Sequence, residues 1–216
     1  MATAQASAAP VTGTTTPSSG PDAAPREPSG VAWVSRFPTS ASVDDCVEPF
    51  RGHVTDFIAA LRAAGATVKV SATLRPPQRA YLMHWCWCIV KGQADPRTVP
   101  ARNDVGIAWA HVDAQGAFDR GASVAGAQAM VDAYGMQNLK VAPALESRHI
   151  DGLAVDMNIG WTGTLQIKIR NGTAVQVAGE PRTGMNPDLR VVGATYGVIK
   201  FVGGDTDPPH WSDNGH

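Results

Sequence analysis

Residues 147–156, SRHIDGLAVD, decide which fold we expect. Asp151-Gly152 predicts a tight bend, and beyond it apolar positions 153, 155 and 157 alternate with Ala154, Asp156 and position 158. Such alternation is typical of a strand, and it places the small residues 152 and 154 on the face that carries Asp156. His149, just before the bend, can turn to the same side. The stretch therefore predicts a histidine and an aspartate meeting over open space, which suits a borderline metal such as zinc.

A second stretch, DPPHW at 207–211, supplies the rest of the site. Two prolines favour the polyproline conformation with three residues per turn, so Asp207 and His210 should point the same way. Catalytic zinc sites use three protein ligands and leave the fourth position to water, whereas structural sites use four protein ligands. We therefore expect His149, Asp156 and His210 to bind Zn²⁺, with Asp207 as the base that takes a proton from the activated water.

Outward from these stretches, the pattern predicts helices mixed with strands. Apolar spacing after Ser42 predicts a helix from Val47 to Leu61 that ends at Gly65, and others should span 76–92, 123–134 and 186–196. Strands are expected at 67–74 and 198–202, and a hairpin over 164–177 should turn at Asn171-Gly172. Because no regular βαβ rhythm appears, the fold class expected is α+β, with a small, mostly antiparallel sheet packed with helices.

Composition limits the classes of protein. The first 30 residues are mainly Ala, Ser, Thr, Pro and Gly, so we expect a flexible low-complexity tail at 1–30 and one domain at 31–216. A net charge of -1 gives no attraction to nucleic acid or anionic lipid. No apolar run is long enough for a membrane span, and no secretory signal is recognisable, so export would need another route. Three cysteines, an odd count, suggest small buried residues rather than a disulfide framework.

The pattern S-R-H-x-x-G-x-A-x-D followed by D-x-x-H-W resembles a family of zinc peptidases. This family includes D-Ala-D-Ala carboxypeptidases and dipeptidases and phage L-Ala-D-Glu endolysin peptidases, and its wider fold group includes lysostaphin-type enzymes and the hedgehog signalling domain. The resemblance spans about 47–211 and implies that His149, Asp156 and His210 are zinc ligands. It implies that Asp207 is the catalytic base, where many members have the longer Glu.

The resemblance also implies roles for two residues outside the metal ligands. Arg75, before Pro76-Pro77, matches the arginine that steadies the substrate carbonyl or carboxylate, and so counts as both catalytic and substrate-binding. Ser147, at the head of the motif, is expected to bind substrate and to brace the site by a hydrogen bond. Ser71 and Thr73 precede Arg75 as in related sequences and are expected to support the site.

The implied activity is that of a zinc metallopeptidase acting on peptidoglycan stem peptides. It would hydrolyse either a D-Ala-D-Ala or an L-Ala-D-Glu bond in the bacterial cell wall, in the periplasm or outside the cell, as a monomer. The alternative is a non-catalytic, zinc-containing module that binds the cell wall or a partner, because the hedgehog domain shows that such a fold serves binding too.

Other interpretations of single residues stay open at this point. His149 and Asp156 could form a structural hydrogen-bonded pair, and His210 could be a solvated residue near the chain end. Asp205 competes with Asp207 as the base, and Glu146 is a reserve acid. His111 and Asp113 alternate and could mimic a ligand pair. The substrate role of the stretch between Gly160 and Tyr196 is open.

Overall fold

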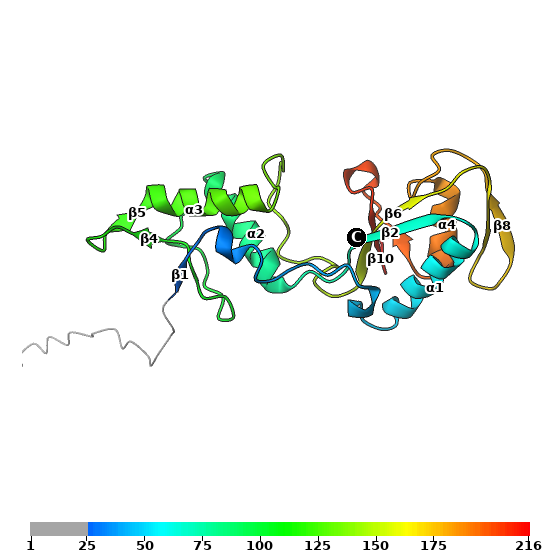
Figure 1. The fold of residues 1–216 in the computed structure, drawn as a ribbon, viewed down its shortest axis with the longest axis horizontal. Coiled ribbons are helices and arrows are strands. Elements are labelled where there is room, and N and C mark those ends of the chain that lie inside the picture. The colour runs from blue at the N-terminus through cyan, green and yellow to red at the C-terminus, as the bar shows by residue number, and fades with distance from the viewer. Residues whose placement is uncertain (1–25) are drawn as a thin grey trace, which may run out of the picture.

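The computed structural model describes residues 26–216, which form an elongated molecule with two lobes (Figure 1). The tail predicted at 1–30 lies mostly outside the described residues. Its last five residues are described, and Glu27–Pro28 forms a short strand that pairs with Ile107–Ala108. Trp33 Nε1 also donates a hydrogen bond to the Pro28 carbonyl at 3.1 Å. The described structure thus begins before the boundary expected at Val31.

The elements follow in chain order. The helices are α1 (Phe50–Ala63), α2 (Pro77–Val90), α3 (Arg120–Ala133) and α4 (Pro187–Thr195), with short 3-10 helices η1 (Val31–Trp33), η2 (Val43–Asp45) and η3 (Gly204–Thr206). The strands are β1 (Glu27–Pro28), β2 (Thr67–Ala72), β3 (Ile107–Ala108), β4 (His111–Val112), β5 (Phe118–Asp119), β6 (Ala154–Gly160), β7 (Leu165–Lys168), β8 (Ala174–Val177), β9 (Ile199–Lys200) and β10 (His210–Ser212). This mixture confirms the α+β class.

The principal sheet has four strands in the order β2-β6-β10-β9, and every pairing in it is antiparallel. The strand expected at 198–202 is shorter, as β9, and it is not the last one. The chain end contributes β10, which lies between β6 and β9, so a segment that showed no strand pattern forms part of the sheet's centre. The hairpin β7–β8 forms a separate two-stranded sheet with its turn at Asn171-Gly172, as predicted.

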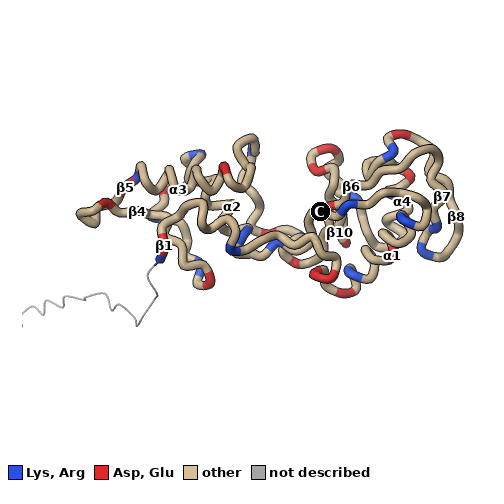
Figure 2. The backbone as a smooth tube through the Cα atoms, in the orientation of Figure 1, with Lys and Arg blue, Asp and Glu red and all other residues tan. Residues whose placement is uncertain are grey.

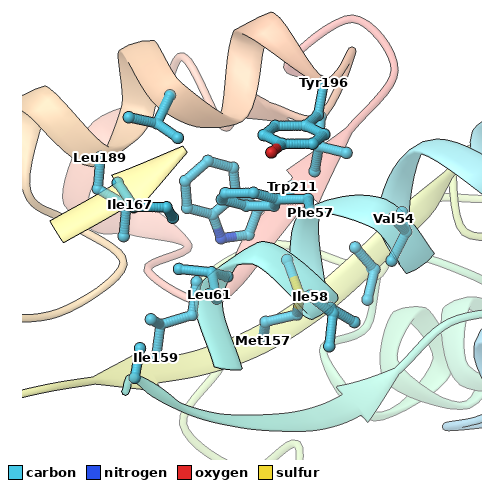
Figure 3. Close-up of a cluster of buried hydrophobic side chains, with 14 of the residues drawn as sticks. Val54, Phe57, Ile58, Leu61, Met157, Ile159, Ile167, Leu189, Tyr196 and Trp211 are labelled. Carbon is cyan, nitrogen blue, oxygen red and sulfur yellow. The ribbon is translucent and has the colours of Figure 1, made fainter. Parts of the chain in front are cut away.

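We call the part built from η2, α1, α4 and strands β2 and β6–β10 the sheet lobe. Its hydrophobic cluster lies where α1 and α4 pack on the inner face of the sheet (Figure 3). Trp211 is fully buried there, and its ring centroid lies 5.6 Å from that of Phe57. Val155, Met157 and Ile159 of β6 join the same cluster. Because strand residues alternate between faces, Asp156 is directed to the other face of the sheet.

The other part, built from β1, η1, α2, β3–β5 and α3, is the helical lobe (Figure 1). It has its own hydrophobic cluster, in which α2 packs against α3 and residues such as Leu82, Ile107 and Met130 are fully buried. The region expected to form one domain therefore contains two separate hydrophobic clusters. From residue 26 on, the chain runs through β1 and η1 of the helical lobe, passes to the sheet lobe, returns through α2 and α3, and finishes in the sheet lobe.

One helix begins later than its apolar spacing predicts. Ser42 caps the short η2, accepting a hydrogen bond from the Asp44 backbone, and α1 starts only at Phe50. Val47 is 44% exposed, so it is not part of the buried stripe. The interruption follows from Pro49, which cannot continue a helix begun before it. At the other end, Gly65 adopts a positive φ of 90°, as a helix C-terminal glycine should.

Charged residues of both signs are interspersed over the two lobes (Figure 2). All three cysteines are free and buried, in agreement with their expected role as small core residues. Within residues 26–216, none of the helices has the length and apolar character needed to cross a lipid bilayer.

Candidate metal centre

Two adjacent strands and one turn bring the three predicted ligands together. Asp156 lies in β6 directly opposite His210 in β10, so the register of the sheet places their side chains next to each other. His149 precedes the turn at Gly152, whose φ is +70°, and the turn folds its side chain back toward the sheet. His149 and His210 are 4% and 6% exposed, so both rings are held inside the protein.

Three donor atoms of these residues form a nearly equilateral triangle. His149 Nε2 lies 3.1 Å from Asp156 Oδ1 and 3.1 Å from His210 Nδ1. The third side, from His210 Nδ1 to Asp156 Oδ1, measures 3.3 Å. Each residue thus presents one metal-ligand atom to a common centre, and the described residues contain this one group of that kind.

The partners of the outer ring nitrogens determine the tautomer of each neutral histidine. His149 Nδ1 lies 2.6 Å from the Thr73 carbonyl oxygen, and His210 Nε2 lies 3.1 Å from the carbonyl of His216. A carbonyl only accepts, so each of these nitrogens must donate its proton outward. In the neutral rings the inward nitrogens are then lone-pair acceptors facing a carboxylate. This is how histidine ligands are oriented around bound metals.

The electrostatics of the group favour a positive charge at its centre. Burial alone raises the pKa of Asp156, but the His149 and His210 rings, which can donate to this carboxylate when their inward nitrogens carry a proton, outweigh burial and hold that pKa well below its ordinary value. Burial alone lowers the pKa of His210, whereas its hydrogen bond to Asp156 raises the pKa above the usual value. Three converging acceptors repel one another unless a proton or metal ion lies between them.

The spacing fits a small four-coordinate ion. In a tetrahedral site with metal–ligand bonds of about 2.0–2.1 Å, the donor atoms lie about 3.3–3.4 Å apart. The observed sides of 3.1 to 3.3 Å are close to that value. Calcium takes six to eight oxygen ligands at longer distances, which two imidazoles and one carboxylate do not provide. A group of three such residues could therefore hold a metal ion.

Asp207 lies at the rim of this group, but by a different backbone route from the one predicted. Residues 207–210 form a turn in which the His210 backbone N–H donates to the Asp207 carbonyl at 3.3 Å, rather than an extended polyproline segment. The turn still brings Asp207 Oδ2 within 3.9 Å of His210 Nδ1. The Asp207 side chain is 50% exposed, so it faces solvent beside the buried rings. Burial and the charge of Asp156 raise the pKa of Asp207.

Arg75 and Ser147 lie at the point where the helical lobe joins the sheet lobe. The Arg75 backbone N–H donates to the His149 carbonyl at 2.9 Å. Burial lowers the pKa of its guanidinium, and the negative charges of Asp156 and Asp207 act in the opposite direction. Ser147 Oγ is shielded from solvent and has no hydrogen-bond partner among the described residues. The brace expected from this hydroxyl is therefore not found there.

Two supporting residues named from the sequence have clear contacts. Thr73 is fully buried, its carbonyl binds His149, and its hydroxyl donates to the Ser42 carbonyl at 2.8 Å. Ser71 Oγ donates to the Asp156 carbonyl at 3.3 Å. The prediction of open space beside Gly152 is wrong. A side chain at Gly152 would meet Val47 at 3.1 Å, so the space beside this glycine is filled by the protein and is not open to a metal.

None of the competing residues belongs to the group formed by His149, Asp156 and His210. Asp205 is exposed in η3, and Glu146 is exposed on the segment that precedes the motif. His111 Nε2 pairs with Ser29 Oγ at 2.9 Å, and Asp113 accepts hydrogen bonds from the backbone of its own turn. These contacts give His111 and Asp113 structural explanations.

Part of the stretch between Gly160 and Tyr196 contacts β6, the strand that carries Asp156. Thr183 forms an isolated bridge to Gly160 at the end of β6. A surface hollow of about 220 Å³ lies there, lined by residues of β6, of the loop and of the 207–210 turn (Met157, Asn158, Ile159, Thr183, Gly184, Met185 and Pro208). Asn158 and Pro208 are two residues along the chain from Asp156 and His210, but none of the three candidate ligands lines this hollow.

Two charged residues that the sequence analysis did not identify contact the segments that carry the candidate ligands. Lys200 is 5% exposed, and its ammonium contacts carbonyls of the 207–210 turn. Burial lowers the pKa of Lys200 to about 8. Arg148, in the 147–156 motif, forms an ion pair with Asp213, which follows β10; its Nη2 lies 2.6 Å from Asp213 Oδ2. Lys200 could have been identified from the sequence, because it is the one charged residue in the otherwise apolar stretch VIKFV at 198–202.

Scans against protein-family models, curated proteins and solved structures found no match for this chain.

Proposed function

We propose that this chain is a zinc metallopeptidase that hydrolyses peptide bonds in peptidoglycan stem peptides. The observation that carries the proposal is the triangle of His149, Asp156 and His210, with both outer ring nitrogens donating to backbone carbonyls. Three protein ligands of the types His, His and Asp, rather than four, correspond to a catalytic rather than a structural zinc site. When bound, zinc would supply Lewis-acid chemistry, polarising a carbonyl and making water acidic near neutral pH.

The residues around the triangle have matching roles in this proposal. Asp207 is within 3.9 Å of a ligand atom and half exposed, so its carboxylate can accept a proton from a water molecule at the rim and return it to the leaving amine. Arg75, held next to His149 by its backbone, would balance negative charge on the substrate. The loop at 183–185 would contact the peptide beside the reacting bond.

The substrate class rests on the resemblance to D-Ala-D-Ala carboxypeptidases and L-Ala-D-Glu endolysin peptidases. The two activities differ in whether a free carboxylate must follow the reacting bond. Mass spectrometry of muropeptides after digestion of purified cell wall distinguishes them by the mass released.

The test is the variant Asp207→Ala, with Asp205→Ala as the matched control two residues away. Removing the base should leave zinc content unchanged and lower the rate of stem-peptide cleavage about 10²- to 10⁴-fold, the usual contribution of a general base. Metal analysis after desalting and muropeptide mass spectrometry give the two readouts. Undiminished cleavage by Asp207→Ala would remove the catalytic assignment. Full zinc content without cleavage of any stem peptide by the unmodified chain would favour the binding module instead.

A further inference from the structure

Lys200 is a buried lysine whose ammonium is surrounded by carbonyl oxygens. Nζ lies 2.6 Å from the Pro208 carbonyl, 2.7 Å from that of His210 and 3.4 Å from that of Asp207. An ammonium has three N–H donors, so these acceptors match its capacity. All of them belong to the turn that carries Asp207 and His210.

The sequence of that turn explains why it needs outside donors. Pro208 and Pro209 have no backbone N–H, so the segment cannot complete a helical turn or a ladder by itself. Its carbonyls still require partners, because buried unpaired acceptors are costly. The Met157 backbone N–H serves the Pro209 carbonyl at 2.8 Å, and Lys200 serves those on either side of it.

Burying the Lys200 ammonium is costly, because the charge loses most of its hydration. The described residues place no carboxylate within ion-pair distance of its ammonium, so only the more distant charges of Asp207 and Asp156 partly offset the loss of hydration. An apolar side chain here would avoid burying a charge, but it would leave the Pro208 and His210 carbonyls without this donor. The ammonium lies 5.3 Å from the ring centre of Trp211, which provides some favourable interaction. Lysine supplies one side-chain group that donates hydrogen bonds to several carbonyls of the turn at once.

We propose that Lys200 is a positioning residue that holds the 207–210 turn so that His210 Nδ1 completes the metal triangle and Asp207 lies at its rim. Neither the strand pairing of β10 nor the two prolines fixes the turn alone, because β10 begins only at His210. This inference rests on the metal-binding part of the proposed function. It extends that function by naming a residue that shapes the site without touching metal or substrate.

The test compares Lys200→Met, which keeps length without charge, with Lys200→Arg, which keeps charge and donors. Lys168→Met, at an exposed position at the end of β7, is the matched control. Zinc affinity by chelator competition should fall at least about tenfold in Lys200→Met, the usual effect of losing a supporting contact to metal ligands. Lys200→Arg should recover part of that affinity, and Lys168→Met should bind zinc like the unmodified chain. The visible spectrum of the Co²⁺-loaded protein should change in Lys200→Met, because it reports ligand geometry.

The outcomes separate this inference from the proposed function. If the unmodified chain binds no zinc, the proposed function fails. If it binds zinc and Lys200→Met matches it in affinity and cobalt spectrum, the positioning role alone is overturned. If Lys200→Met loses the near-ultraviolet circular dichroism of the metal-free protein, Lys200 is a folding residue and the inference is again overturned.

Discussion

Each lobe has its own hydrophobic cluster, but only the cluster of the sheet lobe adjoins the candidate metal ligands. In the sheet lobe, each candidate ligand on a strand has core residues as its chain neighbours: Asp156 lies between Val155 and Met157, and His210 precedes the fully buried Trp211. In the helical lobe, α2 and α3 bury a comparable cluster, but none of the three candidate ligands belongs to it. Strand alternation therefore connects the candidate metal centre to the core of one lobe. We expect core substitutions in the two lobes to differ in their effect on zinc affinity.

The largest effect should come from the triangle itself. Asp156→Ala removes its only anionic ligand and leaves two imidazoles, so tight zinc binding should be abolished. Asn158→Ala, two positions along the same strand and exposed, is the control and should retain zinc. Chelator competition measures both affinities. Zinc bound equally tightly by Asp156→Ala would show that the metal site lies elsewhere.

The second prediction tests whether a substitution in the core of the sheet lobe lowers zinc affinity. Trp211→Ala should lower the free energy of unfolding by about 3–5 kcal/mol, because it leaves a large cavity beneath β10. Zinc affinity should fall with it, because His210 is the adjacent residue. Denaturant unfolding and zinc titration of the folded fraction provide the measurements.

The counterpart is Met130→Ala in the helical lobe, also fully buried. It should lower the free energy of unfolding by about 2–5 kcal/mol. Zinc affinity of the folded chain should nevertheless stay within about twofold, because distant, independent sites have nearly additive effects. A loss of zinc affinity as large as that of Trp211→Ala would contradict the contrast between the lobes.

The smallest effect is expected at the helix cap of α4. Asn186 is fully buried, its side-chain oxygen accepts from the backbones of Asp188 and Leu189, and its amide donates to the Gly179 carbonyl. Asn186→Ala should lower the free energy of unfolding by about 1–2 kcal/mol, the usual contribution of an N-cap. Asn171→Ala, in the exposed hairpin turn, provides a control for loss of an asparagine, and equal effects of the two variants would count against the cap.

Features that depend on neighbours in the chain could be predicted from the sequence. Asn186-Pro187 begins α4, Asn171-Gly172 turns the β7–β8 hairpin, and Gly65 follows the end of α1, each as expected. The α+β class was predictable for a similar reason, and so was the approach of His149 to Asp156 across the bend at Gly152. Residue type and short spacing are sufficient when backbone preferences and strand alternation determine where a side chain points.

Only the tertiary structure decided what surrounds those residues. The Thr73 and His216 carbonyls that orient the histidines, the Lys200 ammonium in the 207–210 turn, and the division into two cores all depend on segments distant in the chain. Pro208-Pro209 suggested an extended segment, but contacts with Met157 and Lys200 hold it as a turn. The sequence by itself determined which atoms can bind a metal. Their convergence at 3.1 to 3.3 Å follows from the register of β6 with β10, which long-range packing sets.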